Sequence, residues 1–317
     1  MKILVYLREL NESHQKRIQA AAQEHGRSVV FAETKEELMK HGADAEILFA
    51  YSAEEVFAAV PNVKWVQTSG AGIEKQLFPA MMKSGAAFTN AAGVYAPQAA
   101  EHAFALLLAL TRGLRVSIRR QERREWFSTR SSVLEIGGWT LGVIGMGGFG
   151  REMAKRAKGF EMRVIAVDPY CAEKPANVDE LLPLDRLPDL LRRSDAAMLA
   201  CPLTKETERI VDADALSHMK RTAYLINVAR GRLVDEAALC AALRSGQIAG
   251  AGLDVMETEP LPPESPLWEM ENVVLTSHSA GYSQRRADRM VKLFCDNLRR
   301  YTRGEPLQNV VRKELGF

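Results

Sequence analysis

The chain has 317 residues, of which 47% are apolar and 26% charged, and its formal net charge is +2. This length predicts about two domains, and the charge balance argues against bulk electrostatic attraction to nucleic acid or acidic partners. The four cysteines form no CxxC pair and no apolar run reaches membrane-span length, so we expect a reduced, cytoplasmic protein with no metal and no membrane contact.

Short apolar segments alternate with helical patterns in the first hundred residues. Helices are predicted around residues 12–25, 34–41 and 53–59. Strands alternating with helices are typical of a parallel, doubly wound α/β sheet. The predicted strands are KILVYL, SVVFA, AEILFAY and VKWVQTS.

A long helix follows, from Gln98 to Leu114, and its apolar character on nearly all sides predicts that it is buried. Next comes a basic stretch from Arg115 to Arg130. It is either a nucleic-acid patch or a solvated helical arm whose charge Glu122 and Glu125 temper. The arm is favoured, because no basic domain or nucleic-acid motif accompanies the stretch.

A second α/β series begins at Trp139. Helices are predicted at residues 149–159, 184–193, 213–219 and 236–245, and the amphipathic stretch 284–301 predicts a last helix that returns to the first domain. The predicted strands are TLGVIG, RVIAVD, AAMLA, AYLINV, GAGLDV and NVVLTS. The fold class is therefore α/β, with two Rossmann-like, doubly wound parallel-sheet domains and a cleft between them.

The first strand of this series ends in a glycine-rich turn, Gly145-x-Gly147-x-x-Gly150, which is followed by a helix and a second strand. In such a unit the first glycine permits the tight turn, the second lets backbone approach a pyrophosphate, and the third allows close helix packing. Asp168, eighteen residues later, is placed to accept hydrogen bonds from ribose hydroxyls and to repel a 2′-phosphate. NAD is therefore favoured over NADP as the cofactor. The alternative to dinucleotide binding is an ordinary βαβ unit in which the glycines are incidental.

Polar residues follow three later strands. Arg230 comes after LINV, Asp254 and Glu259 after GAGL, and His278 after VVLTS. The carboxyl ends of parallel strands meet at one edge, so these side chains can converge there. Taken singly, each has a structural explanation: a surface arginine, a loop carboxylate or a capping histidine.

The chain resembles the D-isomer-specific 2-hydroxyacid dehydrogenases, over nearly its whole length. The matching stretches, in order, are SGAGIE, AAEH, GVIGMGGFG, CPLTKETERIVD, LINVARGRLVDE, GLDVMETEPL and NVVLTSHSAG. Two positions depart from the family pattern: Ser277 stands where a proline usually precedes the histidine, and Met256 where an aromatic residue is frequent. Both departures concern the positioning of the site and the choice of substrate, and neither removes a catalytic group.

The resemblance implies a role for each polar residue. Arg230 would bind the substrate carboxylate and polarise the 2-keto oxygen, since a guanidinium binds oxyanions in a fixed fork. His278 would be the general acid in reduction, and Glu259 would hydrogen-bond its imidazole and favour the charged form. Asp254 would hold the nicotinamide amide.

Further contacts are implied for substrate and cofactor. Backbone of Gly70, Ala71 and Gly72 would cradle the substrate carboxylate. The implied cofactor-binding positions are Gly145, Gly147, Phe149, Gly150, Asp168, Pro202, Thr207, Val228, Ala229, Asp254, His278 and Gly281.

The expected activity is NADH-dependent reduction of a small 2-oxo acid to the D-2-hydroxy acid. The closing run NVVRKELGF and the loop EPLPPESPLW resemble those of bacterial family members associated with glyoxylate or hydroxypyruvate reduction, and this resemblance implies a substrate of that kind. Residues 1–98 and 284–317 would form the substrate domain and 99–283 the NAD-binding domain, in a homodimer with 115–135 as an arm. The alternatives are an NAD(H)-sensing, corepressor-like binding protein and a formate or phosphite dehydrogenase of the same fold.

Overall fold

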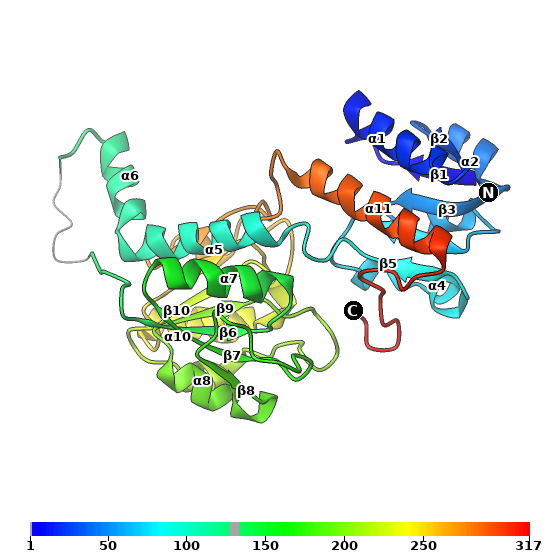
Figure 1. Ribbon diagram of the computed structural model, residues 1–317. Coiled ribbons are helices and arrows are strands. Elements are labelled where there is room, and N and C mark those ends of the chain that lie inside the picture. Colours follow the sequence, from blue (N-terminus) through cyan, green and yellow to red (C-terminus); the bar gives the residue numbers. More distant parts are fainter. Residues whose placement is uncertain (1, 127–132) are drawn as a thin grey trace. The chain divides into compact units, whose positions relative to one another are not determined.

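The structure, a computed structural model, describes residues 2–126 and 133–317, which form two compact units (Figure 1). Unit 1 comprises the chain up to Tyr95 together with Ser283–Phe317, and unit 2 is Ala96–Tyr282. Arg130 of the basic stretch, and with it the middle of the predicted arm, lies outside the described residues.

Unit 1 is built on a five-stranded sheet in the order β2-β1-β3-β4-β5, in which every strand pair is parallel. The inner strands β3 and β4 are almost entirely buried on both faces because helices cover both, as is typical of parallel sheets. The strands are β1 (Lys2–Tyr6), β2 (Ser28–Phe31), β3 (Ala45–Ala50), β4 (Trp65–Thr68) and β5 (Ala87–Thr89). The connecting helices are α1 (Glu12–Gln23), α2 (Lys35–Gly42), α3 (Glu54–Ala58) and α4 (Pro79–Lys83), with a 3-10 turn η1 (Glu74–Gln76).

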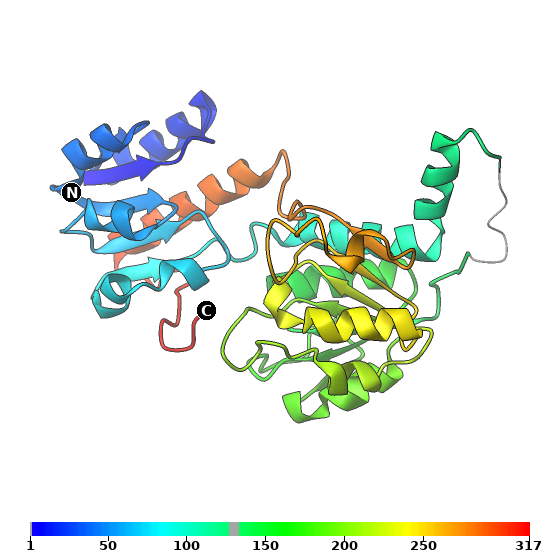
Figure 2. The same ribbon diagram turned by 180° about the vertical axis from the view of Figure 1, so that it is seen from behind.

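The last helix of the chain, α11 (Arg286–Arg303), belongs to unit 1 and lies beside its sheet (Figures 1 and 2). Its apolar face packs on β3 and β4: the ring of Phe294 stacks on Phe49 at 4.3 Å and on Trp65 at 5.4 Å between centroids. All three rings are fully buried, so the predicted return of the last helix rests on a large apolar contact.

Unit 2 holds a seven-stranded parallel sheet in the order β12-β11-β10-β9-β6-β7-β8. The first strand of this sheet, β6, lies in its middle, and later strands are added on both sides. This is the doubly wound arrangement that the alternating pattern predicts. The strands are β6 (Thr140–Ile144), β7 (Arg163–Val167), β8 (Glu180–Leu182), β9 (Ala196–Leu199), β10 (Tyr224–Asn227), β11 (Gly250–Leu253) and β12 (Val273–Leu275). The α/β fold class with two parallel-sheet domains is confirmed.

Helices cover both faces of this sheet (Figure 2). On one side α5 and α7 pack together and bury Ala103, Leu107 and Met153 against β6 and its neighbours. On the other, α8, α9 and α10 bury Leu190, Leu216 and the inner apolar residues of the same strands. The helices of unit 2 are α5 (Ala96–Thr111), α6 (Leu114–Glu122), α7 (Gly148–Gly159), α8 (Leu187–Arg193), α9 (Ala213–Ser217) and α10 (Glu236–Ser245), with 3-10 turns η2 (Leu184–Arg186), η3 (Gly231–Leu233) and η4 (Pro266–Trp268).

The structure differs from the sequence prediction in two details. The strands β5 and β8 and the helix α4 are additional; three-residue strands are too short to show an alternating pattern. The helix predicted to reach Leu114 ends at Thr111, because Gly113 adopts a left-handed conformation with φ of +65°. The start of the basic stretch then forms α6, in which no residue is buried, as expected for a solvated arm.

Within the described ranges, no helix combines the length and apolarity needed to cross a bilayer. The same part of the chain contains no group of three His, Cys, Asp or Glu side chains arranged to hold a metal ion.

Candidate active site

Most of the polar residues singled out in the second half of the chain lie at one edge of the sheet in unit 2. The strands β10, β11 and β12 are neighbours and run parallel, so the loops that follow them leave from the same edge. Arg230 follows β10, Asp254 and Glu259 follow β11, and His278 follows β12.

His278 and Glu259 are in direct contact. The imidazole Nδ1 lies 2.7 Å from Glu259 Oε2, and Glu259 Oε1 accepts a hydrogen bond from the backbone N–H of Met256 at 3.1 Å. A carboxylate can only accept here, so the Nδ1 carries a proton and Nε2 is the nitrogen left to exchange one. The His278 side chain is 52% exposed, which leaves that nitrogen accessible.

Asp254 is 1% exposed and shapes the loop that carries His278. Its Oδ1 accepts from the Thr276 hydroxyl at 2.6 Å and from the Ser279 N–H at 2.8 Å, and its Oδ2 accepts from the Ala280 N–H at 2.9 Å. Its own carbonyl accepts from the His278 N–H at 2.7 Å. These contacts hold the loop although position 277 is a serine and not the proline that is usual in the family pattern.

Arg230 lies in a loop packed against the Glu259 loop. A Cβ on the next residue, Gly231, would fall 1.8 Å from the carbonyl oxygen of Met256, so only glycine permits this approach. The backbone of Arg230 is held by Asn227, whose Nδ2 donates to the Arg230 carbonyl at 2.8 Å. The guanidinium donates to the Ala229 carbonyl at 2.7 Å, which turns it back over the end of β10.

The glycine-rich turn has the geometry of a phosphate loop. Gly145 has φ of +98°, and a Cβ there would lie 2.5 Å from the backbone nitrogen of Cys201. A Cβ on Gly150 would lie 2.0 Å from the Gly145 carbonyl oxygen, whereas one on Gly147 would meet nothing within 4 Å. Gly147 is the N-cap of α7 and makes no side-chain capping bond, so the first N–H groups of this 12-residue helix are available for an anion.

Asp168 follows β7 and lies beside this turn. Its Oδ2 accepts from the Met146 N–H at 2.6 Å, and its Oδ1 accepts from the Tyr170 N–H at 2.7 Å. Each oxygen keeps a second acceptor position, as ribose hydroxyls require. A cation missed by the sequence analysis lies nearby: the Arg151 guanidinium of α7 is 3.7 Å from the thiol of Cys171, in the loop after Asp168.

The remaining cofactor positions implied by the resemblance lie in α7 or in loops after β9, β10 and β12. The loop after β9 is closed on itself, because the Thr207 hydroxyl donates to the Pro202 carbonyl at 2.7 Å. The loop after β12 is tied to α5, since Gln98 Nε2 donates to the Gly281 carbonyl at 2.9 Å. These positions are Phe149, Pro202, Thr207, Val228, Ala229 and Gly281.

The predicted substrate loop, Gly70 to Gly72, lies in unit 1 after β4 and is held by the fully buried Gln76. The Gln76 Oε1 accepts from the Thr68 hydroxyl at 2.6 Å and from the Ser52 N–H at 3.0 Å, and its Nε2 donates to the Gly72 carbonyl at 3.2 Å. All of these partners are neutral.

The other carbonyls of this loop also have partners within unit 1. The Gly70 carbonyl accepts from the Ala91 N–H at 2.9 Å, and the Ala71 carbonyl accepts from Asn90 Nδ2 at 3.1 Å. The peptide planes of the loop are therefore oriented by their carbonyls.

Sequence reasoning missed three supporting side chains. Gln76 was not singled out, and Thr276 was treated only as part of a strand. His102, the histidine of AAEH, was quoted for the resemblance but given no role, although its Nε2 lies 2.8 Å from Thr276 Oγ1. The available signal was its position on the polar side of an otherwise apolar helix.

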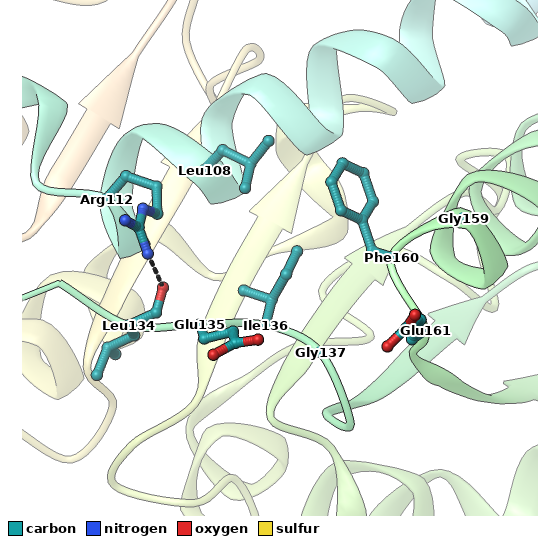
Figure 3. A pocket seen from close by; sticks show the side chains of 9 residues that line it. All are labelled: Leu108, Arg112, Leu134, Glu135, Ile136, Gly137, Gly159, Phe160 and Glu161. Carbon is teal, nitrogen blue, oxygen red and sulfur yellow. Dashed lines mark hydrogen bonds between the residues drawn. The ribbon is translucent and has the colours of Figure 1, made fainter.

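A cavity of about 270 Å³ lies elsewhere in unit 2, near the end of α5 (Figure 3). Arg112 in its wall is bonded to the Leu134 carbonyl at 3.1 Å. None of the residues predicted for the site lines this cavity, so we assign it no part in the chemistry. Its lining residues are Leu108, Arg112, Leu134, Glu135, Ile136, Gly137, Gly159, Phe160 and Glu161.

Comparison with known proteins identifies the family. Residues 104–280 match the model of the D-isomer specific 2-hydroxyacid dehydrogenase NAD-binding domain. A glyoxylate reductase of Korarchaeum cryptofilum is 40% identical over 268 residues, covering 82% of this chain and 80% of that protein.

Two solved structures have the same fold over nearly their whole length. A D-isomer specific 2-hydroxyacid dehydrogenase family protein of Aeromonas salmonicida superimposes with a TM-score of 0.86 at 31% identity, covering 98% of this chain and 99% of the other. A D-isomer specific 2-hydroxyacid dehydrogenase of Xanthobacter autotrophicus, in complex with NADPH and MES, gives 0.84 at 30%, covering 99% of each chain. The chain thus belongs to the D-isomer-specific 2-hydroxyacid dehydrogenases, a family of oxidoreductases that act on CH–OH donors.

Proposed function

We propose that this protein reduces a small 2-oxo acid, of the size of glyoxylate or hydroxypyruvate, to the D-2-hydroxy acid with NADH. The observation that carries the proposal is the contact between His278 and Glu259 at the carboxyl edge of the sheet that also holds the glycine-rich turn. The 40% identical relative is named a glyoxylate reductase, which supports the substrate class.

His278 is the proton donor in this proposal. Glu259 accepts from Nδ1 and thereby orients the ring and stabilises its positive charge, while Nε2 delivers a proton to the carbonyl oxygen of the substrate. The carboxylate itself need not take up the proton, because its task is to hold the imidazole and to offset its charge.

Arg230 binds the substrate carboxylate and polarises the 2-keto oxygen. Its guanidinium offers several N–H donors in one plane, and it donates one hydrogen bond to the Ala229 carbonyl at 2.7 Å. The close packing of Gly231 on Met256 holds the Arg230 loop against the loop that carries Glu259.

The loop of unit 1 is proposed to bind a carboxylate group through its backbone N–H groups. A trans peptide directs its C=O and N–H to opposite sides. The carbonyls of Gly70 and Ala71 point at Ala91 N and Asn90 Nδ2, so the N–H groups of Ala71 and Gly72 point the other way. Two such groups form an anion-binding concavity.

NAD(H), when bound, supplies the hydride. The Gly145–Gly150 turn and the N-terminus of α7 would hold its pyrophosphate, and Asp168 would accept from the ribose hydroxyls. The remaining acceptor position of Asp254 Oδ2 would bind the nicotinamide amide, since a carboxylate has about four such positions. Asp168 supports NADH over NADPH; the NADPH bound in the Xanthobacter relative makes this preference a point to test.

A homodimer is also proposed, built on unit 2. It is supported by α6, on which Leu114 and Ile118 are 47% and 54% exposed. Sedimentation of the full chain would test it: a monomer at working concentrations would contradict it.

The deciding experiment measures oxidation of NADH and of NADPH with glyoxylate, hydroxypyruvate, phosphohydroxypyruvate, pyruvate, phenylpyruvate and branched 2-oxo acids. Turnover with NADH preferred, fastest on a small acid, is the expected result. Silence on all of them with NADH still bound would contradict the proposal and favour the sensing alternative.

A further inference from the structure

A second histidine is linked to the loop that carries His278. His102 lies on α5, and its Nε2 is 2.8 Å from the hydroxyl oxygen of Thr276 and 3.5 Å from Asp254 Oδ1. Thr276 is 174 residues away in the sequence and is the first residue after β12. The side chain of His102 is 23% exposed, so most of it is buried against this loop.

The direction of these hydrogen bonds follows from the donors present. The Thr276 hydroxyl has one proton and lies 2.6 Å from Asp254 Oδ1, which already accepts from the N–H of Ser279. That proton is therefore given to Asp254. The hydroxyl oxygen must then accept from His102, so the Nε2 of His102 carries a proton. Both hydrogen bonds, from His102 to Thr276 and from Thr276 to Asp254, are thus directed toward the buried carboxylate of Asp254.

This arrangement sets the backbone that carries the acid–base group. His278 has φ of +50°, a left-handed conformation that is unfavourable for a non-glycine residue and persists only where its surroundings impose it. The bonds from the N–H groups of His278, Ser279 and Ala280 to Asp254 impose it. Glu259 holds the imidazole ring, and Asp254 holds the backbone below it.

A second contact comes from the same face of α5. Gln98 precedes His102 by four residues, which places the two side chains one above the other on the helix. Its Nε2 donates to the Gly281 carbonyl, at the far end of the same loop. The segment 276–281 is thus held at both ends by one helix face, and at its centre by Asp254.

We propose that His102 and Thr276 are positioning residues for the acid–base His278, acting through Asp254. The proposal rests on the proposed reaction. In it, Thr276 keeps the Asp254 carboxylate in the orientation that accepts from Ser279 and Ala280, and His102 keeps the Thr276 hydroxyl turned toward Asp254. Losing either should let the loop relax and misplace His278 Nε2, while the parts of the proposed cofactor site outside this loop, the Gly145–Gly150 turn and Asp168, stay formed.

The test compares paired variants. Thr276→Val removes the hydroxyl at constant shape and Thr276→Ser restores it; His102→Leu removes the donor and His102→Gln restores one. His218→Gln is the matched control, since that histidine is equally buried at 25% exposed and pairs with Asp214 on α9. The readouts are kcat, KM, the Kd of NADH, and amide exchange of the segment 276–281.

We expect Thr276→Val and His102→Leu to lower kcat on the order of ten- to hundredfold, because small misplacement of a catalytic group has effects of that size. KM and the Kd of NADH should change less than about threefold, and the amides of Ser279 and Ala280 should exchange faster. Thr276→Ser and His102→Gln should recover most of the rate.

A kcat near wild type in both removing variants would overturn the proposal. So would a loss that the restoring variants share, or one with unchanged exchange in 276–281. If Thr276→Val fails to fold, Thr276→Ser and the His102 pair decide. If the wild-type chain reduces no 2-oxo acid, the proposed function fails, and the exchange measurement still decides whether His102 and Thr276 hold the loop.

Discussion

A buried side chain is central to the support of the loop at residues 69–72 in unit 1 and another to that of the loop at 276–281 in unit 2, and these two side chains differ in charge. Gln76 holds the first through its amide, and its partners are a hydroxyl, an N–H and a carbonyl. Asp254 holds the second through its carboxylate, and a second carboxylate, Glu259, contacts His278. Both loops follow the carboxyl end of a parallel strand.

The difference agrees with the groups that the two loops are proposed to handle. A carboxylate beside Ala71 and Gly72 would repel the substrate anion, so a neutral amide is the suitable support there. Beside His278, the Glu259 carboxylate would stabilise an imidazolium in the proposed reaction. The Asp254 carboxylate accepts the backbone N–H groups of the loop. In the proposed reaction, a neutral group therefore supports the loop that would bind the anion, and a charged group supports the loop that carries the general acid.

The largest expected effect comes from removing the imidazole that is proposed to act as the general acid in unit 2. His278→Ala should lower kcat for 2-oxo acid reduction by roughly 10²–10⁴, because a general acid contributes about that much. NADH binding, followed by its fluorescence, should stay nearly intact. His218→Ala serves as the control, and an unchanged rate in His278→Ala would remove this residue from the mechanism.

Changing the side chain that supports the unit 1 loop from a neutral amide to a carboxylate should weaken binding of the 2-oxo acid. Gln76→Glu replaces the amide that donates to the Gly72 carbonyl by a group facing that oxygen with like charge. We expect KM for the 2-oxo acid to rise on the order of tenfold to a hundredfold, with a smaller change in kcat. Gln76→Met, which has similar shape and no charge, separates the charge effect from lost hydrogen bonds: an equal KM in both variants would refute the electrostatic explanation.

The loop after β7 extends the comparison to a third case, because its carboxylate, Asp168, is proposed to accept hydrogen bonds from the ribose hydroxyls of the cofactor. Asp168→Ala should narrow the preference for NADH over NADPH by about tenfold, because hydrogen bonds to a charged group are lost and repulsion of the 2′-phosphate ends. The ratio of kcat/KM for the two cofactors measures this. A wild-type enzyme that already prefers NADPH would show the ribose argument to be wrong and would direct attention to Arg151.

The smallest expected effect concerns the thiol beside that loop. Cys171 and Cys295 are both partly exposed, whereas Cys201 and Cys240 are buried. Burial raises the pKa of Cys201 to about 12 and that of Cys295 to about 11, and it also raises the pKa of Cys240. Near pH 8 these three thiols stay protonated and unreactive, so iodoacetamide should modify Cys171 first. Saturating NADH should slow that modification by a few-fold, as peptide mass spectrometry would show; no protection would place the adenosine away from this loop.

Much of the fold was predictable from local patterns. Buried parallel strands appear as short apolar runs, and the helices between them have the expected periodicity, so the two doubly wound domains could be recognised. The short edge strands β5 and β8 could not, because three residues carry too little pattern. The end of α5 at Thr111 depended on the left-handed Gly113, a local conformation that composition does not reveal.

Some residues of the candidate site could likewise be predicted from the sequence, and others could not. The residues Arg230, Glu259 and His278 could be singled out because each follows a strand end and because their order matches a family. The side chains that hold the loops in place could not be, since Gln76, His102 and Thr276 are common residue types at unremarkable positions. The contact between His102 and Thr276 joins segments 174 residues apart in the chain, and Gln76 joins three turns of unit 1, so residue type alone does not indicate which side chains meet.

The sequence by itself determined the order of strands and helices, the glycine-rich turn and the chemical groups available for a hydride-transfer reaction, because these depend on neighbours within a few tens of residues. Only the tertiary structure decided how those groups are supported. The N–H groups of a loop, the hydroxyl of Thr276 and the imidazole of His102 converge on Asp254 only when β11, β12 and α5 pack together. The physical reason is that a buried carboxylate must be satisfied by donors, and the folded chain recruits them wherever its elements meet.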